Sequence, residues 1–173
     1  MDILYTVDEK YLQAVEELNY GELPKALHYF NQILEIDPEY ARAYYQIGNF
    51  YYYQFKDYQA AGYYLKKCIT LNPLFPDVYV HYLKLLIALK MHQPMICLAE
   101  KALHIPGVCQ AEIYELLGKY AEQQGNFQEA EQRYQRALLA TVEIREDNSL
   151  SDHIKRVGLK IASKKKMIYS YQL

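Results

Sequence analysis

The chain has 173 residues, of which 51% are apolar and 23% charged, and a formal net charge of −2. This material suffices for a folded core, and the charge balance excludes a protein that binds nucleic acid through its overall charge. The sequence has no run of about 18 apolar residues, and its start, MDILYTVDEK, lacks the basic and apolar regions of a signal peptide. We therefore expect a soluble cytoplasmic protein.

A pattern returns along the chain every 34 or 35 residues. Its landmarks are an alanine, a large apolar residue four positions later and a proline, found at Ala26, Phe30 and Pro38 and, 35 residues on, at Ala61, Leu65 and Pro73. A third copy starts at Ala130 and continues with Tyr134. Repetition at this period is typical of a solenoid of helix pairs.

Turn signals divide the copies into four helix pairs within residues 1–142, at about 7–40, 41–75, 76–107 and 108–142. The 35-residue spacing of the second pair implies one extra residue within Tyr52–Lys56, which would rotate the side chains there by about 100°. The third pair is irregular, with Leu83 and Met95 in place of the expected glycine and alanine. Its segment His92–Met95 indicates either a weak seam in the stack or a divergent packing solution.

Two glycines are expected in the middle of helices. Gly48 and Gly118 would each cost their helix about 1 kcal/mol relative to alanine. Close contact with the second helix of the same pair, where Ala61 and Ala130 offer small surfaces, would offset this cost.

These residues resemble the tetratricopeptide repeat family, most clearly over residues 111–138, AEIYELLGKYAEQQGNFQEAEQRYQRAL. The resemblance covers about 135 of the 173 residues. It implies an all-α, right-handed α-solenoid of four helix pairs with a C-terminal capping helix, and a role in protein binding.

The segment after Thr141 is expected to form this cap. Residues 143–148 indicate a loop or a frayed helix end, residues 149–168 a helix, and residues 169–173 a tail. An apolar stripe on the helix would cover the last pair; it consists of Leu150, Ile154, Val157, Ile161 and Ile168. The outer face is predicted to be basic, with Lys155, Arg156, Lys160, Lys164, Lys165 and Lys166. This basic tail is either a solvated helix end or a site for a membrane surface, RNA or an acidic partner.

Catalytic patterns are missing from the sequence. The five histidines are scattered, there is no glycine-rich phosphate loop, and serine occurs only from Ser149 onwards. Cys68 and Cys97 are predicted to be buried, reduced thiols on second helices. We therefore predict no enzyme activity, no cofactor and no metal site.

The family resemblance implies that first helices line a concave groove. The candidate partner-binding residues are Tyr11, Val15, Tyr45, Gln46, Asn49, Tyr52, Tyr53, His81, Lys84 and Lys119, with Leu12, Asn19, Asp77, Glu115 and Glu122 beside them. Tyrosine is abundant, with 20 in the chain. Of these, Tyr44, Tyr51, Tyr58 and Tyr64 occupy positions that the repeat buries, whereas Tyr45, Tyr52 and Tyr53 are expected to face the groove.

These residues predict a non-catalytic interaction scaffold or adaptor that binds a peptide or helical segment of a protein partner. The alternative is a dedicated chaperone for a secreted or assembly substrate, similar to small bacterial tetratricopeptide secretion chaperones. Nucleic acid is not an expected partner, a membrane is disfavoured, and self-association through the groove stays open. Co-chaperones of this family hold carboxylates with lysines, asparagines and an arginine. The corresponding positions here are Tyr11, Val15, Gln46, Asp77 and His81, so binding of acidic heat-shock chaperone tails is not expected.

Overall fold

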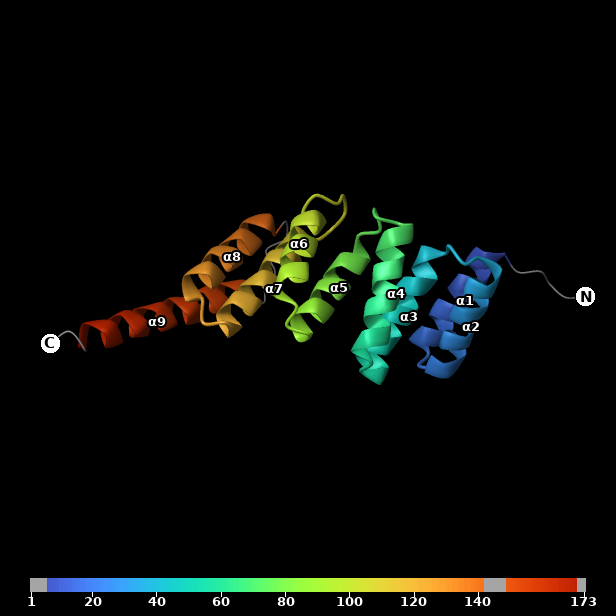
Figure 1. The fold of residues 1–173 in the computed structure, drawn as a ribbon, viewed down its shortest axis with the longest axis horizontal. Helices are drawn as coiled ribbons and strands as arrows, with labels where there is room; N and C mark the ends of the chain where they lie inside the picture. Colours follow the sequence, from blue (N-terminus) through green and yellow to red (C-terminus); the bar gives the residue numbers. More distant parts are fainter. Residues whose placement is uncertain (1–5, 142–148, 171–173) are drawn as a thin grey trace, which may run out of the picture. The chain divides into compact units, whose positions relative to one another are not determined.

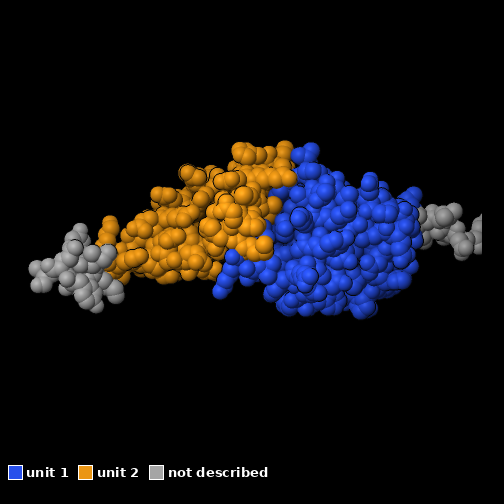
Figure 2. All heavy atoms as spheres, viewed as in Figure 1, with its two compact units in different colours: residues 1–90 blue, residues 91–173 orange. Residues whose placement is uncertain are grey.

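The computed structural model describes residues 6–141 and 149–170, apart from the side chains of residues 167–170, and within these ranges it holds helices and no strand. The all-α class is therefore confirmed. The chain forms two compact units, residues 1–90 and residues 91–173 (Figure 2). Each unit is described by itself below.

Unit 1 holds two complete helix pairs and one further helix (Figure 1). The first pair is α1 (Val7–Asn19) and α2 (Leu23–Ile36), and the second is α3 (Ala41–Phe50), continued by the π-helix η1 (Tyr51–Phe55), and α4 (Tyr58–Leu71). The helix α5 (Asp77–Ala88) completes the unit. Unit 2 contains α6 (His92–Ala102), α7 (Gln110–Gln123), α8 (Phe127–Ala140) and α9 (Ser149–Ser170). The division thus falls inside the third predicted pair, just before His92.

Local signals begin these helices. Thr6 and Glu9 form a capping box at α1. The Thr6 hydroxyl accepts a hydrogen bond from the Glu9 backbone amide, and the Glu9 carboxylate accepts one from the Thr6 backbone amide at 2.7 Å. The carboxylate of Asp57 accepts a hydrogen bond from the Ala60 backbone amide at 3.0 Å and so caps α4. Pro24 lies in the first turn of α2, where its missing amide hydrogen is not needed.

The predicted close approach at the two helix glycines is confirmed. A Cβ atom added to Gly48 would lie 2.8 Å from two side-chain atoms of Leu65, and one added to Gly118 would lie 2.7 Å from two ring atoms of Tyr134. Gly48 and Leu65 lie in unit 1, whose first core cluster consists of Ala14, Ala26, Phe30, Ile33, Ala43, Ile47 and Phe50. Gly118 and Tyr134 lie in unit 2, beside Ala121, Ala130 and Val157.

The π-helix η1 accommodates the extra residue predicted between Tyr52 and Lys56. Its wider turn inserts one residue without ending the helix, and it closes with a bond from the Asp57 amide to the Tyr51 carbonyl at 3.0 Å. One prediction nearby is wrong. Tyr58 was expected to be buried but is 37% exposed, because it is the first residue of α4 and lies at the turn. Tyr44 is buried, and Tyr51 and Tyr64 are partly buried.

The cysteines also divide. Cys68 is buried, as predicted, and burial raises the pKa of its thiol to about 12. Cys97 is exposed, which corrects the prediction. The buried residues of α6 are Met95, Leu98, Ala99 and Ala102, at helical spacing, and Cys97 lies on the other side of the helix.

Candidate functional site

The first helices of unit 1 are joined by hydrogen bonds between candidate groove residues. The Gln46 amide on α3 donates to the Tyr11 hydroxyl on α1 at 3.1 Å. The Tyr45 hydroxyl on α3 lies 3.2 Å from Nδ1 of His81 on α5. We call the surface built by α1, α3 with η1, and α5 the first-helix face of unit 1. It is defined by Tyr11, Leu12, Val15, Tyr45, Gln46, Asn49, Tyr52, Tyr53, His81 and Lys84.

Tyr45 is packed into this face. Its ring meets those of Phe75 and His81 edge to face, with centroids 5.1 and 5.4 Å away. Burial is the main cause that raises the pKa of Tyr45 to about 12. Nδ1 of His81 also lies 3.0 Å from the Asp77 carbonyl oxygen. Tyr45 and His81 therefore position neighbouring helices, and little of their polar surface remains for a ligand.

Other members of the face are more accessible. Leu12 is 63% exposed and Tyr53 is 41% exposed, while Val15 and Tyr52 are partly buried. The Tyr53 ring lies edge to face with those of Tyr52 and His81, with centroids 4.6 and 5.8 Å away. These aromatic contacts hold Tyr53 in place while leaving part of its ring open. Leu12 and Tyr53 are thus the apolar side chains best placed to touch a partner.

The amide groups of the face have different surroundings. Gln46 is used between α1 and α3, whereas the side-chain oxygen of Asn49 is buried and accepts no hydrogen bond from the described residues. Burial raises the pKa of Tyr52. The charge of Lys84 on α5, which is partly buried, opposes this rise. The face is therefore aromatic and apolar, with amides and one lysine.

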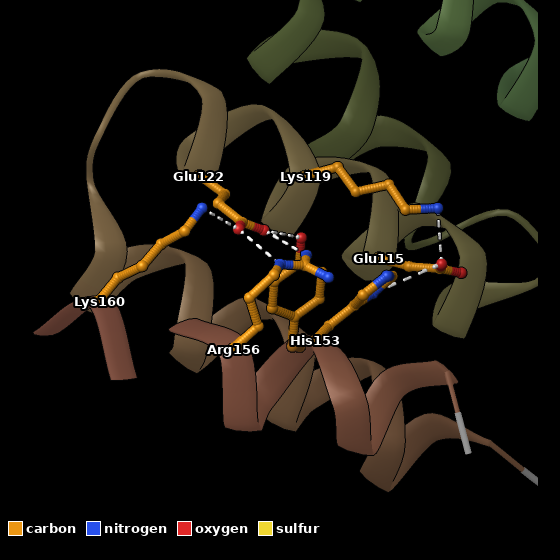
Figure 3. Close-up of polar contacts among 7 residues, drawn as sticks. Glu115, Lys119, Glu122, His153, Arg156 and Lys160 are labelled. Atoms are coloured by element: carbon orange, nitrogen blue, oxygen red, sulfur yellow. Dashed lines mark hydrogen bonds and ion pairs between the residues drawn. The ribbon is translucent and has the colours of Figure 1, made fainter. Parts of the chain in front are cut away.

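In unit 2, α9 covers Glu122, one of the candidate groove residues (Figure 3). Glu122 on α7 accepts hydrogen bonds from Arg156 at 2.7 and 2.9 Å, from Lys160 at 2.8 Å and from the Tyr134 hydroxyl at 2.9 Å. Its side chain is only 10% exposed. The Arg156 guanidinium is the main cause that holds the pKa of Glu122 well below its usual range. Glu122 therefore binds α9 to the last helix pair and is no longer open to a partner.

A second group of contacts lies beside Glu122. Lys119 and Glu115 form an ion pair at 2.7 Å, and Nδ1 of His153 on α9 lies 3.9 Å from the same Glu115 oxygen (Figure 3). The His153 ring packs on Tyr134, with centroids 4.9 Å apart. Burial, and secondarily the positive charge of Arg156, lowers the pKa of His153. Lys119 stays exposed but is paired with Glu115.

These contacts correct one part of the sequence interpretation. Arg156 and Lys160 were assigned to an outward basic face, but both are bound to Glu122. Lys155, Lys164, Lys165 and Lys166 are exposed, as expected. The apolar stripe packs on α7 and α8 through Leu150, Ile154, Val157 and Ile161. The fifth member, Ile168, has a side chain outside the described residues.

Two further features of the described residues concern metal ions and membranes. Among them, no group of three or more histidine, cysteine, aspartate or glutamate side chains is arranged to hold a metal ion. No helix in the same part of the chain is both long and apolar enough to cross a bilayer.

Solved structures show the same fold. PilF of Pseudomonas aeruginosa superposes with a TM-score of 0.76 at 16% identity, over 96% of this chain and 72% of its own. YrrB, described as a TPR protein with an unusual peptide-binding site, gives 0.72 at 20% identity, over 92% and 78% of the two chains. MamA gives 0.69 at 23% identity, over 78% of each chain. At these identities the likeness concerns the fold.

The sequence itself carries the family signal. A search among curated proteins finds no match. Two models described as tetratricopeptide repeat match residues 11–74 and residues 111–141, which together are more than half of the chain. The first range contains Gly48 and Ala61, and the second contains Gly118 and Ala130. The chain therefore belongs to the tetratricopeptide repeat family.

Proposed function

We propose that this protein is a non-catalytic interaction scaffold that holds a peptide or helical segment of a protein partner on the first-helix face of unit 1. The carrying observation is that Leu12 and Tyr53 are exposed on a face whose helices are joined by the Tyr11–Gln46 and Tyr45–His81 contacts. A face held in this way loses little conformational entropy on binding.

The composition of the face favours a partner with apolar side chains. Tyrosine offers a large contact area with few rotatable bonds and a hydroxyl group for hydrogen bonding. The unpaired oxygen of Asn49 would accept a partner's N–H group after a small side-chain adjustment. The family supports protein binding in general, and the description of YrrB supports a peptide as one type of ligand in this fold.

The experiment is affinity capture of partners from the native lysate with wild type and with a Leu12→Asp/Tyr53→Ala variant. These two residues are preferred to Tyr45, whose removal would take away both the hydroxyl contact and a ring contact with His81 on α5. The matched control is Tyr63→Ala, which removes a tyrosine that is 62% exposed on the second helix α4. All three proteins should have the same circular dichroism and melting temperature.

We expect a partner that is retained by wild type and by Tyr63→Ala but lost by the double variant. Equal retention by all three proteins would contradict the assignment of the face. Loss of the partner in Tyr63→Ala alone would indicate that it binds to the second helices instead.

A further inference from the structure

The first helices end in a left-handed residue at equivalent places. Glycine has this role after α1, as Gly21 with φ 85°, and after α7, as Gly125 with φ 76°. Lysine has it after η1, as Lys56 with φ 57°, and after α5, as Lys90 with φ 55°. The closing bonds also correspond, since the amides of Gly21, Lys90 and Gly125 each donate to the carbonyl three residues earlier, at 3.0 to 3.1 Å.

A lysine is unfavourable in this conformation. The Cβ atom of an L-residue crowds the backbone when φ is positive, whereas glycine has no Cβ atom. The first and last repeats show that glycine fits the position. Neither Lys56 nor Lys90 has an ion pair among the described residues that would offset the strain. Residues in such conformations cluster at functional sites, which makes these two lysines candidates for binding.

Exposed apolar side chains accompany both lysines. Phe55 is 56% exposed, Tyr58 is 37% exposed and Leu89 is 42% exposed, while both lysines are exposed as well. The turn after η1 and the end of α5 lie along one edge of unit 1, the lower edge in Figure 1. We call Phe55, Lys56, Tyr58, Leu89 and Lys90 the turn-edge patch. Tyr53 of the first-helix face lies two residues before Phe55 in the sequence.

The charge of the patch is positive. Asp57 is the single acidic residue in residues 51–58 and 84–90, and its carboxylate is used to cap α4. Lys84 adds a further positive charge close to Tyr52, whose ring lies 5.6 Å from that of Tyr58. Unit 1 as a whole, with 8 basic and 11 acidic residues in positions 1–90, has a net charge of −3. The patch is thus a basic and aromatic area on an otherwise acidic unit.

We propose that the turn-edge patch binds an acidic segment of a protein partner, in which carboxylates alternate with apolar side chains. The lysines would pair with the carboxylates, and Phe55, Tyr58 and Leu89 would receive the apolar groups. A short acidic segment meets only the patch, whereas a long polyanion such as RNA would also meet the negative remainder of unit 1. A bilayer is disfavoured because Phe55 alone among the three apolar side chains is more than half exposed.

The test is isothermal titration calorimetry of the full chain with two synthetic peptides. One has alternating glutamate and leucine, and the other has glutamine in place of each glutamate. The variant is Lys56→Gly/Lys90→Gly, which removes both charges and relieves both strained positions, so it should melt at a higher temperature than wild type. The matched control is Lys66→Ala/Lys165→Ala, which removes two exposed lysines outside the patch.

We expect the glutamate peptide to bind wild type and the control equally, and to bind the glycine variant about tenfold more weakly. The glutamine peptide should bind weakly to all three. Absence of binding, equal binding of both peptides or an unchanged affinity of the glycine variant would overturn the proposal. So would binding only to anionic vesicles or to single-stranded RNA in parallel titrations. Leu12→Asp should leave peptide binding unchanged, which separates this result from the proposal for the first-helix face.

Discussion

The ring of Tyr134 occupies the space in which a side chain on Gly118 would stand, with 2.7 Å between a Cβ atom placed on Gly118 and two ring carbons. The same tyrosine donates its hydroxyl to Glu122 at 2.9 Å, and Glu122 binds Arg156 of α9. One contact between α7 and α8 therefore also sets the position of the carboxylate that holds the capping helix.

Gly118→Ala is expected to destabilise the protein by about 1–3 kcal/mol, because the displaced Tyr134 ring outweighs the gain in helix propensity. Chemical denaturation measures this loss. The control is Gly158→Ala on α9, where the nearest atom to an added Cβ is 3.9 Å away, and which should be neutral or stabilising by up to about 1 kcal/mol. Equal effects of the two substitutions would contradict the close packing.

The sequence predicted the relationship at Gly118 because a glycine in the middle of a helix needs a compensating contact. The extra residue that the π-helix accommodates was similarly indicated by the 35-residue spacing, since it must be placed somewhere between Gly48 and Ala61. The partners of surface charges were not predictable. The sequence placed Arg156 and Lys160 on the outer face of the helix, because nothing in it links them to Glu122, which lies 34 residues before Arg156. Only the packing of α9 on α7 and α8 brings these side chains together.

The left-handed helix ends give opposite expectations for two substitutions. Lys56→Gly should stabilise the protein by about 1 kcal/mol, because glycine adopts a positive φ without a steric cost. Gly125→Ala should destabilise by a similar amount of about 1 kcal/mol, although no atom lies within 4 Å of the added Cβ. Thermal unfolding of both variants checks this, with Lys56→Ala as a control that leaves the strain in place and the stability nearly unchanged.

The three thiols should differ in reactivity. Cys97 and Cys109 are exposed, whereas Cys68 is buried and its pKa is raised to about 12. A thiol reagent added to the native protein is therefore expected to modify two cysteines quickly and the third only after unfolding. Mass spectrometry of the modified peptides identifies them. Rapid modification of Cys68 in native conditions would show that the thiol reagent can reach the buried face of α4.

Glu122→Gln should loosen the capping helix. The substitution keeps the size of the side chain but removes the charge that Arg156 and Lys160 share, at an expected cost of about 1–2 kcal/mol. Hydrogen exchange should accelerate in residues 149–161 while that in α1 and α2 stays unchanged. Glu129→Gln is the control, because its ion pair with Arg133 lies within α8 and does not involve α9. Equal exchange of α9 in both variants would exclude Glu122 as its main attachment.

Acidification should release the capping helix in two stages. Burial is the largest influence on His153 and lowers its pKa. Among the charged groups that face it, Arg156 and Lys119 also lower the pKa, whereas Glu115 and Glu122 raise it. An unfolded histidine binds a proton below about 6.5, before the folded one does, so stability falls as the pH drops through this window.

The pKa of Glu122 is also lowered, chiefly by Arg156, so its contribution is present above the unfolded value of 4.5 and is lost as the pH falls further. Hydrogen exchange of α9 measured from pH 7 to pH 3, corrected for the intrinsic rate, should thus accelerate first below about 6.5 and again below about 4.5. His153→Phe keeps a ring against Tyr134 and removes the titrating group. The first stage should disappear in this variant and the second should remain, because Glu122 still binds Arg156. Persistence of the first stage would assign it to a different group.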